Sequence, residues 1–530
     1  MTQAKRIRIS AIFLAIGSFL LGPAAHAEWW EARTSHFIIY SETNRADAEK
    51  FAIELERFDN ALRTLQNMPV PGADVGEANR LTVFRTGDTD RVNYYLDTSG
   101  SGIAGIYFGR AGNPVSFVPA RNKIDTSKGI QTGPRLEPIR VLFHEYTHHF
   151  MLANFNTTYP HWYREGFAEL YSTIEFRPDG SFHVGNVPQD RGEALDALPD
   201  LKLERLFDHD VKLTGLEYYQ SYSFGWLMSH YLNFEPSRAG QLQAWLKALN
   251  SGEDSLTAAK RIFGDLDKLQ AELRRYKRGP FLGYDVKPAD YTDPQVAMRR
   301  LSPAEEAVLP AYMRSQRGVD PNEAKGVARD IAGKASAYPD NLFVQLALAE
   351  AQQDARNYDE AIAAADRALA VAPTSSAAHY RKGAILLDRA ETEKADYAAA
   401  RAQFAKARQL DPLDPRPAIG YYRSYQQAGE AIPEPALIAL EEVFKYAAYD
   451  PEYRMLLGRQ LLWEDKGDLA KGVLAPLAYS GHDGGERKDG PVIGDVVDAI
   501  DAGRLDEAKA KMAEIFKKAK DARDGKKIRH

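Results

Sequence analysis

The chain has 530 residues, a formal net charge of −6 and no cysteine. Without cysteine, disulfides, thiolate metal ligands and a cysteine nucleophile are all excluded. The mild acidity, and the lack in the sequence of a basic stretch interleaved with aromatic residues, predict no nucleic-acid partner. A chain of this length is expected to fold as more than one domain.

The first 27 residues have the features of a cleavable secretory signal. Basic residues at positions 5, 6 and 8 precede an apolar run over 11–21, and Ala25-His26-Ala27 is an A-x-A cleavage sequence. We therefore predict cleavage between Ala27 and Glu28 and a periplasmic or secreted protein. No later stretch is apolar over the length that a spanning helix needs, so no transmembrane segment is expected in the mature chain.

Residues 28–135 are predicted to carry the sheet of the first domain. We expect strands at 29–33, 36–40 and 81–85, a helix at 45–68, and an edge hairpin of strands 103–108 and 115–118. Such an edge could bind an extended peptide by backbone pairing. Helices are expected to dominate residues 136–280.

The most informative stretch is His144-Glu145-Tyr146-Thr147-His148. Pro138 suits the first turn of a helix, and apolar residues on either side of the motif give that helix a face to bury. Residues four apart share one helix face, so both imidazoles can reach a single metal ion. Glu145, one position round the helix, is then placed to act as a general base. The alternative is a plain helix pair of histidines without metal.

A third ligand is expected from the segment that begins at His161. Glu165 follows His148 by seventeen positions, which allows a loop and a return on a second helix. Two imidazoles and one carboxylate, with one position left open, form the usual ligand set of a catalytic zinc site. Glu169 lies on the same helix face and suits hydrogen bonding to the free N–H of a ligand histidine. The reverse assignment, with Glu169 as the ligand, stays open.

These segments, together with Ser221-Tyr222-Ser223-Phe224-Gly225, resemble the gluzincin (peptidase-MA-like) metallopeptidases, which include the zinc aminopeptidases. The resemblance covers roughly residues 28–280. In the aminopeptidases, HExxH is followed by Asn-Glu-Gly-Phe-Ala with the third ligand, and later by Tyr-x-Lys-Gly, whose tyrosine stabilises an oxyanion. The resemblance implies an α+β zincin-like catalytic domain with Zn²⁺ on His144, His148 and Glu165. It also implies that Glu145 and Tyr222 are catalytic.

Two departures from the family pattern bear on the activity. Phe224 replaces the lysine beside the tyrosine, and the Gly-x-Met-Glu-Asn segment that holds a substrate's amino terminus in aminopeptidases is missing. The stretch most like it in position, Gly109–Val115, offers no carboxylate. We therefore expect an endopeptidase rather than an aminopeptidase, which stays an alternative.

Three other side chains have simpler interpretations. Tyr222 could be an ordinary core or surface aromatic, because tyrosines 218 and 219 lie close by in the sequence. His149 is one position off the ligand face and is expected to point away from the metal. His161 is interpreted as a satisfied or solvated histidine, with a substrate-side role as the alternative.

Residues 281–303 are predicted to be a linker, because prolines at 280, 288, 294 and 303 break regular structure. Residues 304–530 are alanine-rich and repeat: Pro339, Pro373, Pro412 and Pro451 are spaced by 34, 39 and 39 residues. This pattern resembles tetratricopeptide repeats, with residues 391–395 as a loop insert. It predicts an all-α superhelical domain that binds a protein partner. A generic helical bundle is the alternative.

Taken together, the sequence predicts an exported zinc metallopeptidase that cleaves peptides or unfolded proteins. The rival hypothesis is a catalytically inactive or structural zinc domain on a protein-binding scaffold of the cell envelope. Glu145 argues against that rival, because a structural site needs no general base and is normally closed by a fourth protein ligand.

Overall fold

The structure is a computed structural model that describes residues 28–70, 72, 74–98, 105–121, 137–208, 211, 213–289, 291–478 and 492–525. The predicted signal segment, and with it the predicted cleavage point and export, lie outside the described residues. So do positions 103 and 104 of the expected edge hairpin.

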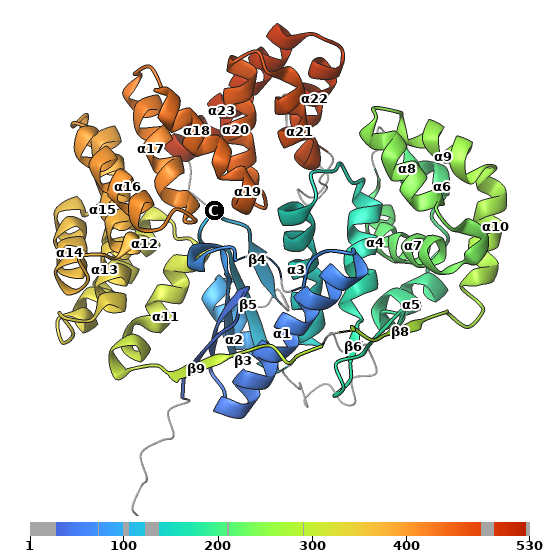
Figure 1. Cartoon of the computed structure of the whole chain (residues 1–530), viewed down its shortest axis with the longest axis horizontal. Coiled ribbons are helices and arrows are strands. Elements are labelled where there is room, and N and C mark those ends of the chain that lie inside the picture. The colour runs from blue at the N-terminus through green and yellow to red at the C-terminus, as the bar shows by residue number, and fades with distance from the viewer. Residues whose placement is uncertain are drawn as a thin grey trace, which may run out of the picture.

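A six-stranded sheet forms the centre of the molecule, in the order β4-β5-β3-β2-β1-β9 (Figure 1). β2, β3 and β5 run parallel, while β4, β1 and β9 are antiparallel to their neighbours. The strands expected at 29–33, 36–40, 81–85 and 115–118 are confirmed to within a few residues. Of the expected strand 103–108, the structure confirms Ile106–Phe108, which is β4, the edge strand beside β5. The bounds are β1 Trp30–Arg33, β2 Phe37–Ser41, β3 Leu81–Asp88, β4 Ile106–Phe108, β5 Val115–Arg121 and β9 Ala297–Arg300.

Both faces of this sheet are covered, as the uninterrupted burial of β2 requires. Phe37 and Ile39 pack with the helices α1 (Arg45–Leu65) and α3 (Pro138–Asn154). Ile38 and Tyr40 point to the other face, where Leu309 of α11 (Pro303–Arg317) joins the same core. The helical half of the chain therefore completes the core of the first half.

A second region of helices packs beside α3 and carries a three-stranded sheet, β6-β7-β8. Its core is shared with α1 and α3. Two short elements lie between the strands of the central sheet, the 3₁₀ turn Glu77–Asn79 and α2 Thr89–Leu96. The elements of the second region are α4 His161–Ser172, β6 Glu175–Phe176, β7 Phe182–Val184, α5 Gln189–Ala197, α6 Leu203–Phe207, α7 Gly215–Phe234, the 3₁₀ turn Pro236–Arg238, α8 Gln241–Asn250, α9 Ser255–Phe263, α10 Leu266–Tyr276 and β8 Tyr284–Val286.

The expectation that residues 281–303 lack regular structure was wrong in two places. β8 lies between Pro280 and Pro288, and β9 lies between Pro294 and Pro303. The prolines flank these strands instead of interrupting them, so the backbone N–H groups that the ladders need are present. β9 pairs with β1 at the edge of the central sheet. The segment is thus part of the first domain's two sheets.

Residues 303–525 form an array of helices that curves around the sheet (Figure 1). Consecutive helices contact each other from α11 to α19 and again from α20 to α23, and α11, α13, α15 and α17 also pack in a row. Its helices are α11, α12 Pro321–Ala335, α13 Leu342–Asp354, α14 Tyr358–Val371, α15 Ser376–Glu393, α16 Ala398–Leu410, α17 Pro415–Ala428, α18 Glu434–Glu442, α19 Phe444–Ala447, α20 Pro451–Trp463, α21 Gly467–Ala478, α22 Ile493–Asp501 and α23 Leu505–Gly525. The mixed α+β part followed by an all-helical part agrees with the predicted fold class. The zincin-like and tetratricopeptide-like assignments stay predictions.

One detail of the repeat prediction needs correction. Residues 391–393 belong to α15 instead of forming the start of a loop insert, because the helix continues to Glu393 and ends at Lys394 in a left-handed conformation. The longer spacing between Pro373 and Pro412 is thus partly due to a longer helix, α15.

The array holds the β4–β5 turn directly. Arg110 donates to the carbonyl oxygens of Gln316 and Arg317 (2.8 and 3.2 Å), and the Ala111 N–H donates to Asp450 (2.8 Å). Gly112 has a φ of +71°, and a Cβ there would clash with Arg416 of α17. The tip of the predicted edge hairpin is therefore bound inside the molecule.

No helix in the described part of the chain combines the length and apolar character that crossing a membrane requires.

Candidate metal centre

Helix α3 presents the HEYTH residues on a well-anchored scaffold. Pro138 occupies its first turn, as the sequence predicted, because the missing N–H of proline costs nothing there. Leu142, Phe143, Tyr146 and Phe150 enter the main core. With that face buried, His144 and His148 are displayed together on another face, with imidazole Nε2 atoms 3.1 Å apart. Glu145 is half-buried beside them.

Helix α4 brings Glu165 to the two histidines. Its Oε2 atom lies 3.3 Å from Nε2 of His144 and 3.3 Å from Nε2 of His148. The Glu165 side chain is fully buried. The structure therefore places the three predicted ligand atoms in one compact triangle, with ligands from two helices.

The size of this triangle fits a metal ion. Ligand bonds of about 2.0–2.1 Å in a tetrahedral zinc site give ligand-to-ligand distances of about 3.3–3.4 Å. The three distances here, 3.1, 3.3 and 3.3 Å, are close to that spacing. The donor set of two imidazoles and one carboxylate also suits Zn²⁺. His144, His148 and Glu165 are thus a group that can hold a metal ion.

The other oxygen of Glu165 is held by a buried arginine. Nε and Nη2 of Arg164 donate to Oε1 of Glu165 at 3.4 and 3.2 Å. Because Arg164 occupies Oε1, the Oε2 atom is the one directed at the histidines. Burial opposes ionisation of Glu165, but the histidines and Arg164 outweigh it and hold its pKa well below the usual range. The carboxylate is therefore ionised and oriented as a ligand must be.

Glu169, one turn further along α4, lies behind His144. Its Oε1 atom is 3.5 Å from Nδ1 of His144, the nitrogen on the side away from the triangle. The same oxygen accepts from Nε and Nη2 of Arg191 in α5 at 2.8 and 2.7 Å. This geometry favours Glu165 as the ligand and Glu169 as the group that orients the His144 ring. The reverse assignment has no such support.

The nearby carboxylates affect the two histidines of the group differently. Burial alone would lower the pKa of His144, but Glu169, Glu165 and Glu145 outweigh it and raise the pKa to about 9. Burial lowers the pKa of His148 despite the nearby Glu165. The carboxylates thus stabilise positive charge on His144, whereas burial outweighs their effect at His148.

Tyr222 reaches the site from α7. Its ring packs edge-on against His161, with centroids 5.5 Å apart, and its hydroxyl is 3.5 Å from that of Tyr218. Burial and the negative charge of Glu165 raise its pKa, so the hydroxyl keeps its proton and remains a hydrogen-bond donor. Tyr222 is thus at the site, as the resemblance implies, and its role as oxyanion donor stays a prediction.

His161 belongs to this site and not to bulk solvent. It opens α4 one turn before Glu165, so its Nδ1 atom lies 3.7 Å from Oε1 of Glu165. Its ring stacks on Tyr218 with centroids 4.8 Å apart. Of the two interpretations, a satisfied or a solvated histidine, these contacts agree with the first, because the i,i+4 relation to Glu165 places both residues on one helix face. A substrate-side role for His161 stays a prediction.

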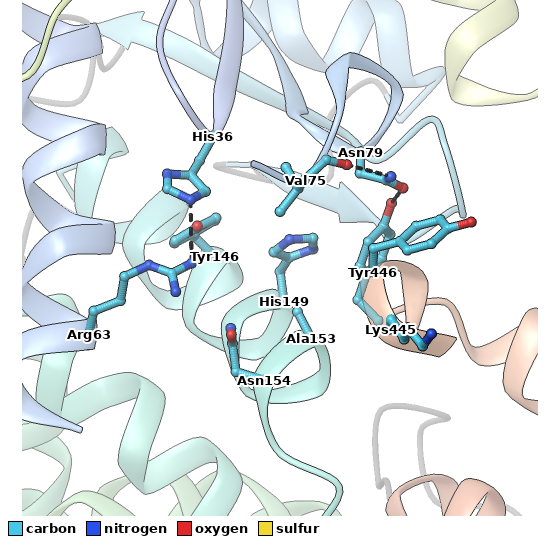
Figure 2. A pocket seen from close by; sticks show the side chains of 11 residues that line it. His36, Arg63, Val75, Asn79, Tyr146, His149, Ala153, Asn154, Lys445 and Tyr446 are labelled. Carbon is cyan, nitrogen blue, oxygen red and sulfur yellow. Dashed lines mark hydrogen bonds between the residues drawn. The ribbon is translucent and has the colours of Figure 1, made fainter. Parts of the chain in front are cut away.

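The opposite side of α3 carries His149, which contacts the edge strand β4 and the array. The hydroxyl of Tyr107 hydrogen-bonds to Nδ1 of His149 at 2.6 Å, and Tyr449 of the array packs against the His149 ring. Burial lowers the pKa of His149 to about 3. His149 lines a polar cavity of about 140 Å³ between α3, α1 and the array, which Figure 2 shows from close by. His149 thus points away from the ligand triangle, as expected.

A second group of potential ligands, His36, Glu56 and Asp59, borders this cavity. His36 lies 2.7 Å from Glu56 and 3.4 Å from Asp59. However, Arg63 donates to Asp59 at 2.6 Å, and its guanidinium also reaches His36 (Figure 2). The two buried carboxylates thus pair with His36 and Arg63, and the four side chains form a buried charge network.

No family model matches the chain, and comparison with curated proteins found no similar sequence. The resemblance to gluzincins therefore depends on the three sequence motifs.

Proposed function

We propose that this protein is a zinc-dependent metallopeptidase that cleaves within peptides or unfolded proteins. The observation that carries the proposal is the triangle of His144, His148 and Glu165, with Glu145 on the neighbouring position of α3. The described residues contribute three ligands to this group, which suits a catalytic site with an open position better than a closed structural site.

The mechanism assigns a role to each side chain. When bound, Zn²⁺ supplies Lewis acidity that activates water and polarises the scissile carbonyl. Glu145 accepts the proton of the attacking water and passes it to the leaving amine. Tyr222, protonated because its pKa is raised, donates a hydrogen bond to the developing oxyanion. Glu165 would hold the metal ion together with the two histidines, and Glu169 orients the ring of His144. Neither carboxylate exchanges a proton in the reaction.

The substrate is proposed to be an extended peptide that pairs with the edge strand β4. The strand is antiparallel to β5 and half-buried along its length. The array holds the turn that follows β4 at Arg110 and Ala111, so it stabilises the edge on which a peptide would lie. Binding of a protein partner by the array, and a periplasmic or secreted location, complete the proposal.

The test is to express the mature chain, measure its zinc content and assay it on a diverse peptide pool. We expect one zinc per chain and cleavage of internal peptide bonds. Glu145→Gln should keep the metal and lose the cleavage, because the amide cannot accept a proton. The matched control is Glu193→Gln, which changes an exposed carboxylate on α5. Protein that binds no zinc even when supplied with it would refute the proposal.

A further inference from the structure

We infer that Arg191 is a positioning residue of this centre, which fixes Glu169 behind the metal ligand His144 and Tyr222 beside the reaction site at the same time. The inference rests on the proposed function and deepens it. Neither the HEYTH motif nor the segment around Glu165 contains Arg191, which comes from α5.

The first contact of Arg191 is with Glu169. Its Nε and Nη2 atoms both donate to Oε1 of Glu169, at 2.8 and 2.7 Å, and that oxygen is 3.5 Å from Nδ1 of His144. The arginine therefore occupies and directs the oxygen that faces the ligand histidine. A carboxylate held in this way can accept the Nδ1–H of His144 and leave Nε2 free for the metal.

The second contact is with Tyr222. The guanidinium carbon of Arg191 lies 5.1 Å from the centre of the Tyr222 ring, within the range of a cation–π interaction. Tyr222 is on α7 and Glu169 is on α4, so one side chain spans two helices of the site. Its position thus sets the distance between the group behind His144 and the proposed oxyanion donor.

The local charges keep Arg191 in place. Its side chain is 18% exposed, and Nη1 forms an ion pair with Asp190 at 3.2 Å. Burial opposes its charge, but Glu169 and Asp190 outweigh this and raise its pKa. A planar guanidinium can serve all three neighbours, since it offers several N–H donors and a flat face, whereas the ammonium of lysine has no such face.

Arg191 also explains why Glu169 does not compete with Glu165 for the metal. Each of these two glutamates is held by its own arginine, Glu165 by Arg164 and Glu169 by Arg191. Without Arg191, the Glu169 carboxylate would lose the donors that fix its rotamer. We therefore expect a changed coordination geometry, and not only a weaker site, when Arg191 is removed.

The experiment measures zinc affinity by competition with a chelator, and the visible spectrum of the cobalt-substituted protein, in full-length mature chains. Arg191→Met should weaken zinc binding about 10-fold or more and shift the cobalt bands, as the loss of an outer-shell partner does. Arg191→Lys should recover part of the affinity because it keeps a charge beside Glu169. Arg205→Met is the control, since Arg205 pairs with Glu217 at the start of α7.

A double-mutant cycle separates positioning from general loss of structure. Glu169→Gln should weaken zinc binding by a similar factor. The double variant, with Glu169→Gln and Arg191→Met, should bind zinc only slightly more weakly than either single variant. Additive losses, or Arg191→Met with wild-type affinity and an unchanged cobalt spectrum, would overturn the inference while leaving the metallopeptidase intact. A wild-type chain that binds neither zinc nor cobalt would instead overturn the proposed function.

Discussion

Gly166 and Gly225 face each other at the crossing of α4 and α7, and neither position has room for a side chain. A Cβ on Gly166 would overlap the carbonyl oxygen of Gly225, and a Cβ on Gly225 would overlap the carbonyl oxygen of Trp162. Gly166 follows Glu165, the proposed ligand, directly, and Gly225 lies one turn after Tyr222. The close approach of the two backbones thus sets how near Tyr222 comes to the candidate metal centre.

We predict that Gly225→Ala destabilises the protein by about 1–3 kcal/mol or more, because the added methyl group meets rigid backbone and the helices must separate. Denaturant unfolding measures the change. The same variant should lose more activity than its stability loss explains, since Tyr222 moves with α7. Gly166→Ala should behave alike.

The control for this prediction is Gly326→Ala in α12, where a Cβ would meet no atom within 4 Å. There the change should stabilise the protein by roughly 0.5–1 kcal/mol, because alanine loses less backbone entropy in a helix. If Gly225→Ala and Gly326→Ala change the free energy of unfolding by the same amount, α4 and α7 are not in tight contact.

The charge network behind α3 predicts a pH-dependent stability. Burial lowers the pKa of His36, but Asp59 and Glu56 outweigh it and raise the pKa above 6.5. The contribution of His36 to stability is thus complete below about pH 6.5 and is lost as the pH rises through the folded-state value. Burial raises the pKa of Glu56, but His36 outweighs it, so the pKa is lowered below 4.5 and its contribution is lost as the pH falls.

His36→Gln should therefore lower the free energy of unfolding most between about pH 4.5 and 6.5. The expected loss is roughly 1 kcal/mol, which is the difference between a charged and a neutral hydrogen bond. The measurement is the free energy of unfolding of both proteins across pH 4–9. In a Glu56→Gln background the cost of His36→Gln should shrink. A cost that grows above pH 7 would contradict the assigned charge of His36.

Local signals in the sequence were sufficient to predict much of the site. Pro138 and the i,i+4 spacing of His144 and His148 identified α3 and its ligand face, and the same spacing placed Glu169 one turn beyond Glu165. Such relations depend only on helix geometry, so they can be read without knowledge of the fold.

Contacts between distant segments could not be predicted in this way. Arg191 meets Glu169 only because α5 packs against α7, and β9 joins β1 across more than half of the chain. The docking of the array was missed for the same reason. The signal at Arg164 was available, because it adjoins Glu165, yet adjacent residues on a helix do not ordinarily face each other.

Arg454 of α20 links the array to α3, the helix that carries His144 and His148. This buried arginine donates to the carbonyl oxygens of Ala448, Val473 and Leu152 and to the side chain of Asn156. Leu152 lies in the last turn of α3, so the array places a cation at the C-terminal end of this helix, where a positive charge is favourable. Burial lowers the pKa of Arg454 to about 10.

Arg454→Met should lower the free energy of unfolding by about 3 kcal/mol or more, because it removes several hydrogen bonds to carbonyl groups in one buried contact. Arg459→Met, which removes a half-exposed arginine stacked on Trp463 of the same helix, should cost much less. Thermal and denaturant unfolding give both values. If the two variants are equally stable, the array does not depend on this contact for its attachment to α3.

The final prediction concerns the end of the substrate that the protein recognises. In the aminopeptidases, the segment corresponding in position to Gly109–Val115 holds the free amino group, but here it is engaged by the array. Arg110 donates to Gln316 and Arg317, and the Gly112 N–H donates to the hydroxyl of Tyr449 at 3.3 Å. We expect a peptide and its N-acetylated twin to be cleaved at comparable rates and at the same internal bond. Mass spectrometry of the products measures both, with Glu145→Gln as the blank. If acetylation abolishes cleavage, the enzyme is an aminopeptidase and a different part of the chain binds the ammonium group.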